Sequence, residues 1–133
     1  MAMITKSEFG VVAVNNDVLC KIVVEEMLRM DDLLVPCNRR GKPCRKSIFG
    51  LNDDMLSSVD VKEQRKTELS VKVYFIAKFG ESINQMANDL FDRIEEEFEL
   101  LCLDKPKVLT ACVKGVLSRQ LQERDVEVVR YND

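Results

Sequence analysis

The clearest pattern lies between residues 69 and 101. From Leu69 to Phe79 every second residue is apolar and the residues between are mostly polar. This alternation predicts a strand with one face on a core. From Ser82 to Leu101 the apolar residues recur at helical spacing instead, which predicts an amphipathic helix with its acids on the opposite face. The predicted apolar stripe consists of Ile83, Met86, Ala87, Leu90, Phe91, Ile94, Phe98 and Leu101.

The junction between this strand and this helix contains the sequence Lys78-Phe79-Gly80-Glu81-Ser82-Ile83. Gly80 allows the chain to turn there, because glycine tolerates backbone conformations that other residues rarely adopt. Ser82 and Gln85 have the spacing of a capping box, in which each side chain accepts from a backbone N–H near the other.

Two elements are expected before this region. Residues Phe9 to Val14 are apolar at both sets of alternate positions, which predicts a sheet strand buried on both sides. A helix follows, capped by Asn15 or Asn16 and ending near Met30.

Strands are also expected at Val59 to Gln64 and at Val108 to Val113, where Gly115 closes the second of them. Residues Ser118 to Arg124 are polar and suit a short helix. Val126 to Tyr131 alternates again, as an additional edge strand would.

The order β-α-β-β-α-β, with an additional C-terminal strand, predicts an α+β fold. We expect a two-layer sandwich in which two main helices pack on one face of a mostly antiparallel sheet. The length of 133 residues suits a single domain, 1–133. Residues 31–56 contain Pro36, Gly41, Pro43 and Gly50, and we expect a flexible insertion there with a short strand near Ser47 to Leu51.

Charge is distributed unevenly, although the net charge is only −3. We call one candidate docking surface the basic loop; it comprises Arg39, Arg40, Lys42, Arg45 and Lys46, with no acid among them. We call the other the acidic helix face; it comprises Asp89, Asp92, Glu95, Glu96 and Glu99. Such asymmetry favours pairing with a neighbour of opposite sign.

The chain contains no histidine, which removes the usual base of serine and cysteine catalysis and the most frequent ligand of catalytic zinc. Exposed helix carboxylates rarely have the shifted pKa values of acid–base catalysts. The sequence has no phosphate-binding loop and no metal-ligand spacing. We therefore predict no catalytic residue, no metal site and no cofactor.

Five cysteines, at positions 20, 37, 44, 102 and 112, in a chain without a secretion signal favour reduced thiols and a cytoplasmic location. Cys20, Cys102 and Cys112 fit small buried side chains. Cys37 and Cys44 leave open a thiol-based redox or metal sensor, since neighbouring basic residues can lower a thiol pKa.

Nucleic-acid binding through the basic loop, at residues 39–46, is a second alternative. It is disfavoured because the chain is acidic overall and Phe49 is the one aromatic residue nearby for base stacking.

Three segments resemble the alkaline-shock-protein, or envelope-stress-response, family of Gram-positive bacteria. They are Gly10-Val11-Val12-Ala13-Val14, the junction from Lys78 to Ile83, and the strand Leu109 to Val113 that leads to Gly115-Val116. Phe79 stands in place of the family's tyrosine, Thr110 in place of its asparagine, and Leu103-Asp104-Lys105 in place of its Thr-Gly. The residues that carry the resemblance are Gly10, Phe79, Gly80, Ser82, Ile83 and Gly115.

The resemblance implies a non-enzymatic cytoplasmic protein of the cell-envelope stress response. Some members gather at the inner membrane face through a small membrane-anchored relative, and some self-assemble. We therefore predict a protein-interaction or scaffold module that forms homo-oligomers and has no membrane span of its own.

Overall fold

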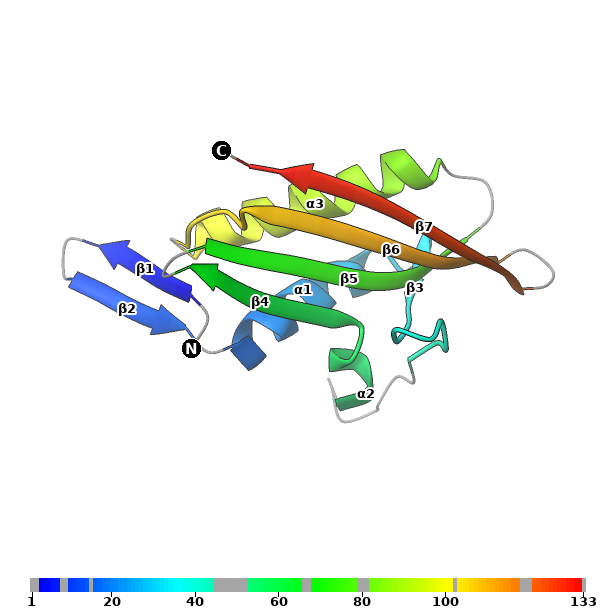
Figure 1. The fold of residues 1–133 in the computed structure, drawn as a ribbon, viewed down its shortest axis with the longest axis horizontal. Coiled ribbons are helices and arrows are strands. Elements are labelled where there is room, and N and C mark those ends of the chain that lie inside the picture. The colour runs from blue at the N-terminus through cyan, green and yellow to red at the C-terminus, as the bar shows by residue number, and fades with distance from the viewer. Residues whose placement is uncertain are drawn as a thin grey trace.

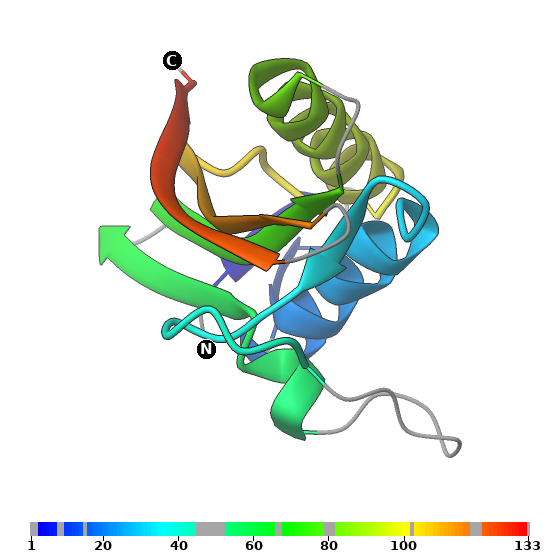
Figure 2. The same cartoon turned by 90° about the vertical axis from the view of Figure 1, so that its right-hand side faces the viewer.

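The computed structural model describes residues 3–7, 10–14, 16–44, 53–65, 68–78, 82–101, 103–117 and 121–132. Its main sheet has five strands: β3 (Leu34–Pro36), β4 (Val59–Arg65), β5 (Glu68–Lys78), β6 (Val108–Leu117) and β7 (Leu121–Tyr131). Two long helices, α1 (Asn16–Arg29) and α3 (Ile83–Leu100), lie on the same face of this sheet (Figures 1 and 2). The predicted two-layer α+β architecture is therefore confirmed.

Strand β5 occupies the centre of the sheet. Along one edge it pairs in parallel with β6, which in turn pairs antiparallel with β7. Along the other edge its first half pairs antiparallel with β4 and its second half with β3. Helix α3 supplies the crossover connection that the parallel pair β5–β6 requires.

The main core lies between the sheet and the two helices. The predicted apolar face of β5 is buried there from Leu69 to Ala77, and the middle of the α3 stripe packs against it. Ile83 is partly buried, whereas Leu101 is 47% exposed, so the stripe ends at Phe98 rather than at Leu101. The core members from α1 are Leu19, Val23, Val24 and Met27.

The first predicted strand does not join the main sheet. It runs as β2 (Gly10–Val14) and pairs antiparallel with β1 (Met3–Ser7), a strand that was not predicted. The expectation that this strand belongs to the main sheet is therefore wrong, and the burial of its side chains lies outside what the structure describes. Only two residues separate β1 from β2, so they pair at a lower loop-closure cost than a strand pairing with the distant sheet.

The expected insertion at 31–56 contains regular structure. Strand β3 pairs with β5, and α2 (Asp53–Leu56) precedes β4. The prediction of an irregular segment is therefore wrong at both of these places, because Leu34 of β3 and Met55 of α2 are buried in the main core. Pro36 is compatible with β3 since that strand lies at the sheet edge. The strand expected near 47–51 lies outside the described residues.

The C-terminal strand is confirmed and is longer than predicted. Residues 121–124, expected in a short helix, belong to β7, while residues 118–120 lie outside the described part of the chain. Gly115 does not close β6, because the strand continues to Leu117 with a shift of register between Val113 and Gly115. Such an irregularity is a frequent position for glycine.

Helix α3 begins with half of the predicted capping box. The Ser82 hydroxyl accepts from the backbone N–H of Gln85 at 3.4 Å. The Gln85 side chain donates instead to Asp89, at 3.0 Å, and so points along the helix. Phe79 and Gly80, the other junction residues predicted to matter, lie outside the described residues.

Candidate interaction surfaces

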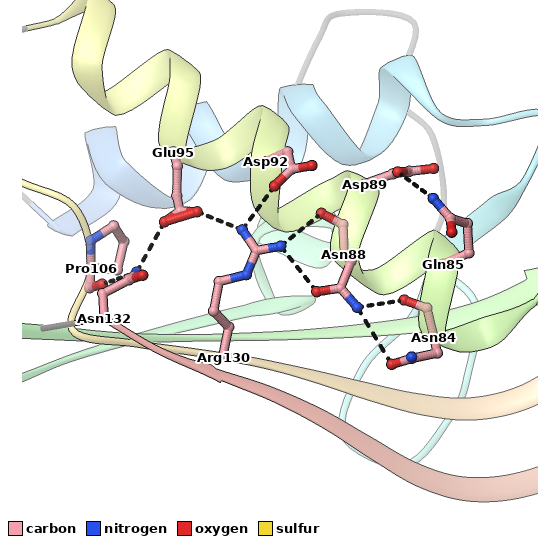
Figure 3. A network of polar contacts seen from close by, with 9 residues as sticks. All are labelled: Asn84, Gln85, Asn88, Asp89, Asp92, Glu95, Pro106, Arg130 and Asn132. Atoms are coloured by element: carbon pink, nitrogen blue, oxygen red, sulfur yellow. Dashed lines mark hydrogen bonds and ion pairs between the residues drawn. The ribbon is translucent and has the colours of Figure 1, made fainter.

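The acidic helix face divides into a buried part and an exposed part. Glu95 is only 9% exposed, so the prediction that it is available for docking is wrong. Arg130 of β7 points toward α3 and donates to the carboxylates of Asp92 and Glu95 (Figure 3). The prediction for Glu95 failed because strand β7 covers this side of the helix, and the helical periodicity of a sequence carries no information about such a neighbour.

Two amides complete what we call the Arg130 network, which comprises Asn88, Asp92, Glu95, Arg130 and Asn132. The Arg130 guanidinium donates to the Asn88 side-chain oxygen at 2.9 Å, and the Asn132 amide donates to Glu95 at 3.0 Å (Figure 3). Asn132 also donates to the backbone oxygen of Pro106 at 2.8 Å. The buried carboxylate therefore has a partner for each of its oxygens, as a buried charge requires.

Arg130 is held in its charged form by this environment. Burial alone would lower the pKa of the Arg130 guanidinium, but the hydrogen bonds that it donates to Asp92 and Glu95 outweigh this effect and raise the pKa overall. The guanidinium also lies 5.3 Å from the centre of the Phe91 ring. The network joins the C-terminal strand to α3.

The remaining acids of this face border an open groove between α3 and the segment that follows α1. The groove has a volume of about 520 Å³. One wall consists of Asp89, Asp92, Arg93 and Glu96, and the other consists of Arg29, Met30, Asp32 and Leu33. Arg29 forms an ion pair at 2.9 Å with Glu26, which is buried beneath it. Burial raises the pKa of Glu26, although Arg29 opposes that effect. The groove is acidic overall, and Glu99 lies one helical turn further along α3.

The start of the basic loop is ordered rather than flexible. The Asn38 side-chain oxygen accepts from the backbone N–H groups of Arg40 at 2.9 Å and Lys42 at 3.1 Å. The backbone N–H of Asn38 also donates to the Lys42 carbonyl at 3.0 Å, and a bridge pairs Cys37 with Pro43. These bonds close a tight turn over residues 37–43.

Gly41 explains how closely this turn approaches the sheet. Its φ of +84° lies in the left-handed region that favours glycine, and a Cβ built there would lie 3.2 Å from the Lys114 Cβ of β6. On the same face, but on the β4 side of β5, the Arg39 guanidinium pairs with Asp60 of β4 at 3.0 Å. The turn therefore spans the face of the sheet opposite the helices.

Beneath the turn lies a second, smaller apolar cluster. Cys37, Tyr74, Ile76 and Cys112 are all buried there, with Val35 packed alongside. Ile76 was the one apolar residue on the otherwise polar face of the predicted strand, and the turn explains its burial. Arg40 and Lys42 remain exposed, and Arg39 and Arg40 border an open groove of about 430 Å³ with Ser57 and Asp60. Arg45 and Lys46 lie outside the described residues.

The thiols of Cys20, Cys37 and Cys112 are not activated. Burial raises the pKa of Cys37 to about 12, and it raises those of Cys20 and Cys112 to about 11. Lys114 acts in the opposite direction on Cys37 but is outweighed. The expectation that neighbouring basic residues lower the pKa of Cys37 is therefore wrong, because the turn removes this thiol from water.

The described residues hold no group of three or more cysteine, aspartate or glutamate side chains positioned to bind a metal ion. None of the helices in the described part of the chain combines the length and the apolar character that crossing a bilayer requires. No protein-family model matches the chain, and searches of curated proteins and of solved structures also find no match. The family resemblance therefore rests on the sequence segments alone and remains a prediction.

The Arg130 network was missed at the sequence level. The signal for it was the alternation in β7, where Arg130 is in phase with Val126 and Val128. Because Val126 pairs with Val113 of the main core, residues in this phase face the helices. The pairing of β7 with β6 was needed to recognise this arrangement.

We predict that Arg130→Met lowers the free energy of unfolding by about 2–3 kcal/mol, because it leaves the buried Glu95 carboxylate without its charged partner. Adding Glu95→Leu should recover most of this loss, since it removes the buried charge as well. Lys62→Met, at an exposed ion pair with Asp60, is the control and should change stability by about 0.5 kcal/mol or less. Urea denaturation measures all three. Equal losses for Arg130→Met and Lys62→Met would contradict the assigned role of the network.

We also predict graded alkylation of the thiols. Raising the Cys37 pKa from 9.0 to about 12 lowers its thiolate fraction about a thousandfold at mildly alkaline pH. Cys44, which is only partly buried, should react well before Cys37 and Cys112. Peptide mapping after timed treatment with iodoacetamide checks this order, with urea-unfolded protein as the control. Reaction of Cys37 as fast as Cys44 in the folded protein would show an accessible thiol and revive the sensor hypothesis.

Proposed function

We propose that this chain is a non-enzymatic protein-interaction or scaffold module of the cell-envelope stress response. In this proposal it works in the cytoplasm, self-assembles, and gathers at the inner membrane face by binding a small membrane-anchored protein. The basic loop and the exposed part of the acidic helix face are its charged docking surfaces.

The observation that carries the proposal is the placement of these charges on opposite layers. Arg40 and Lys42 are exposed on a hydrogen-bonded turn over one face of the sheet. Glu96 and Glu99 are exposed on α3, which covers the other face. A protein with surfaces of opposite sign on opposite layers can bind two neighbours at once, which is what a scaffold requires.

The chemistry of the described residues supports a role without catalysis. The most buried carboxylates, Glu26 and Glu95, are each paired with an arginine. The thiols of Cys20, Cys37 and Cys112 have raised pKa values, which favour the unreactive protonated form. The resemblance of the segments around Gly10, Ser82 and Gly115 to the envelope-stress-response family supports the same proposal.

The proposal is tested by affinity capture from cells that make the protein, with the membrane fraction retained. Neutralising four residues of the basic loop (Arg39→Gln, Arg40→Gln, Arg45→Gln and Lys46→Gln) should reduce capture of a membrane-anchored partner severalfold. The reason is that electrostatic attraction between the two surfaces requires opposite charges on both of them. A matched control neutralises four exposed basic residues elsewhere (Lys21→Gln, Lys62→Gln, Lys105→Gln and Arg124→Gln) and should leave capture unchanged.

Two outcomes would count against the proposal. Equal capture by the wild type, the loop variant and the control would remove the basic loop as a docking surface. Loss of the captured material after nuclease treatment would instead favour nucleic-acid binding through that loop.

A further inference from the structure

Strand β7 leaves one long edge of the sheet open. It is the last strand of the sheet, and no described strand pairs with its outer edge. Its eleven residues therefore present a row of backbone N–H and C=O groups that another strand can pair with. An edge of this length is normally covered or blocked in a monomer.

The second half of β7 is suited to pairing. Val126, 37% exposed, belongs to the helix-facing side, because it pairs with buried Val113. Val129 and Tyr131, 40% and 77% exposed, belong to the opposite side, because Val129 pairs with Thr110. Apolar side chains are thus exposed on both faces of this edge.

The other edge strands are protected. Strand β4 exposes Lys62 and Glu63 and has an irregular register between Glu63 and Arg65. Strand β3 has only three residues and ends in Pro36, which has no N–H to donate. Charged residues, irregularities and proline are the usual means of preventing edge pairing. In β7 most of the exposed charged residues, Glu123, Arg124 and Asp125, lie in the first half, and so does its register shift against β6.

The hairpin β1–β2 has the matching properties. It forms a separate two-stranded sheet and makes few contacts with the rest of the described chain. Its register places apolar residues at both sets of alternate positions, with Met3, Val12 and Val14 in one set and Ile4, Val11 and Ala13 in the other. An isolated two-stranded hairpin is marginally stable in water and needs further pairing or packing.

The position of the hairpin also agrees. Lys6 is the one charged residue in the sequence of β1 and β2, and the charged residues in the second half of β7, Glu127 and Arg130, each have an ion-pair partner in their own chain. Figure 1 shows the hairpin at the end of the long axis toward which β7 runs. Two copies that meet at this end can therefore contact each other reciprocally.

We infer that the chain forms a two-fold symmetric dimer by exchanging hairpins, in which β1–β2 of each copy adds to the free edge of β7 of the other over Val126–Tyr131. The main-chain hydrogen bonds of the added strand supply affinity, and the apolar sequence of the hairpin suits an edge that exposes valines. This dimer does not use the basic loop or the acidic helix face, so it stands or falls separately from the proposed docking surfaces.

The test is analytical ultracentrifugation of the full-length chain at high ionic strength, where contacts between exposed charges are screened. The wild type should sediment at twice the chain mass of 15.3 kDa. Two variants should each sediment at the mass of one chain. The first is Val129→Asp, which blocks the edge, and the second combines Val11→Asp and Val12→Asp, which together disrupt the hairpin. Leu117→Asp, an equally exposed strand position outside the proposed contact, is the control and should remain dimeric.

Mixing the two blocked variants separates this dimer from other modes of association. One partner then contributes an intact hairpin and the other an intact edge, so a single hairpin–edge contact can form and restore the mass of two chains. The inference would be overturned if the wild type sedimented as a single chain or as an assembly larger than two chains at high ionic strength. It would also be overturned if both variants stayed dimeric, or if their mixture stayed monomeric. Circular dichroism should show unchanged secondary structure for Val129→Asp and, for the hairpin variant, a loss no larger than the contribution of β1 and β2.

Discussion

The structure depends on burial of the two central strands, β5 and β6, on both of their faces. On one face the residues from Leu69 to Ala77 pack against α1 and α3 in the main core. On the other face Tyr74, Ile76 and Cys112 would meet water if the turn at 37–43 did not cover them. Because parallel strand pairs are normally buried on both sides, the β5–β6 pair requires this second cover.

This requirement determines where the charges lie. The turn that covers the smaller cluster also carries Arg39, Arg40 and Lys42. Its position is fixed by the close approach of Gly41 to Lys114 and by the ion pair between Arg39 and Asp60. On the opposite layer, the Arg130 network holds α3 so that its remaining acids face outward. The charged surfaces are thus consequences of how the core is closed, and both are held by contacts that do not depend on a partner.

The local elements were predictable from the sequence, and their partners were not. The alternation from Leu69 and the helical stripe after Ser82 are properties of neighbouring residues, so strand β5 and helix α3 could be predicted nearly to their ends. The pairing of Gly10–Val14 with an unforeseen strand depends on the competition between a short loop and a distant sheet. Glu95 was placed wrongly for a related reason, because Arg130 lies 35 residues away in the sequence and meets it only through the pairing of β7 with β6.

Native-state hydrogen exchange at the turn tests the central claim most directly. The backbone N–H groups of Cys37, Asn38, Gly41 and Cys44 each donate to a backbone carbonyl, at 2.9–3.0 Å. If the turn is a fixed cover of the second cluster, these amides should be protected to an extent approaching that of β5 and should exchange in the same opening event. Exchange of these four amides at the rate of an unstructured peptide, with β5 still protected, would contradict the account.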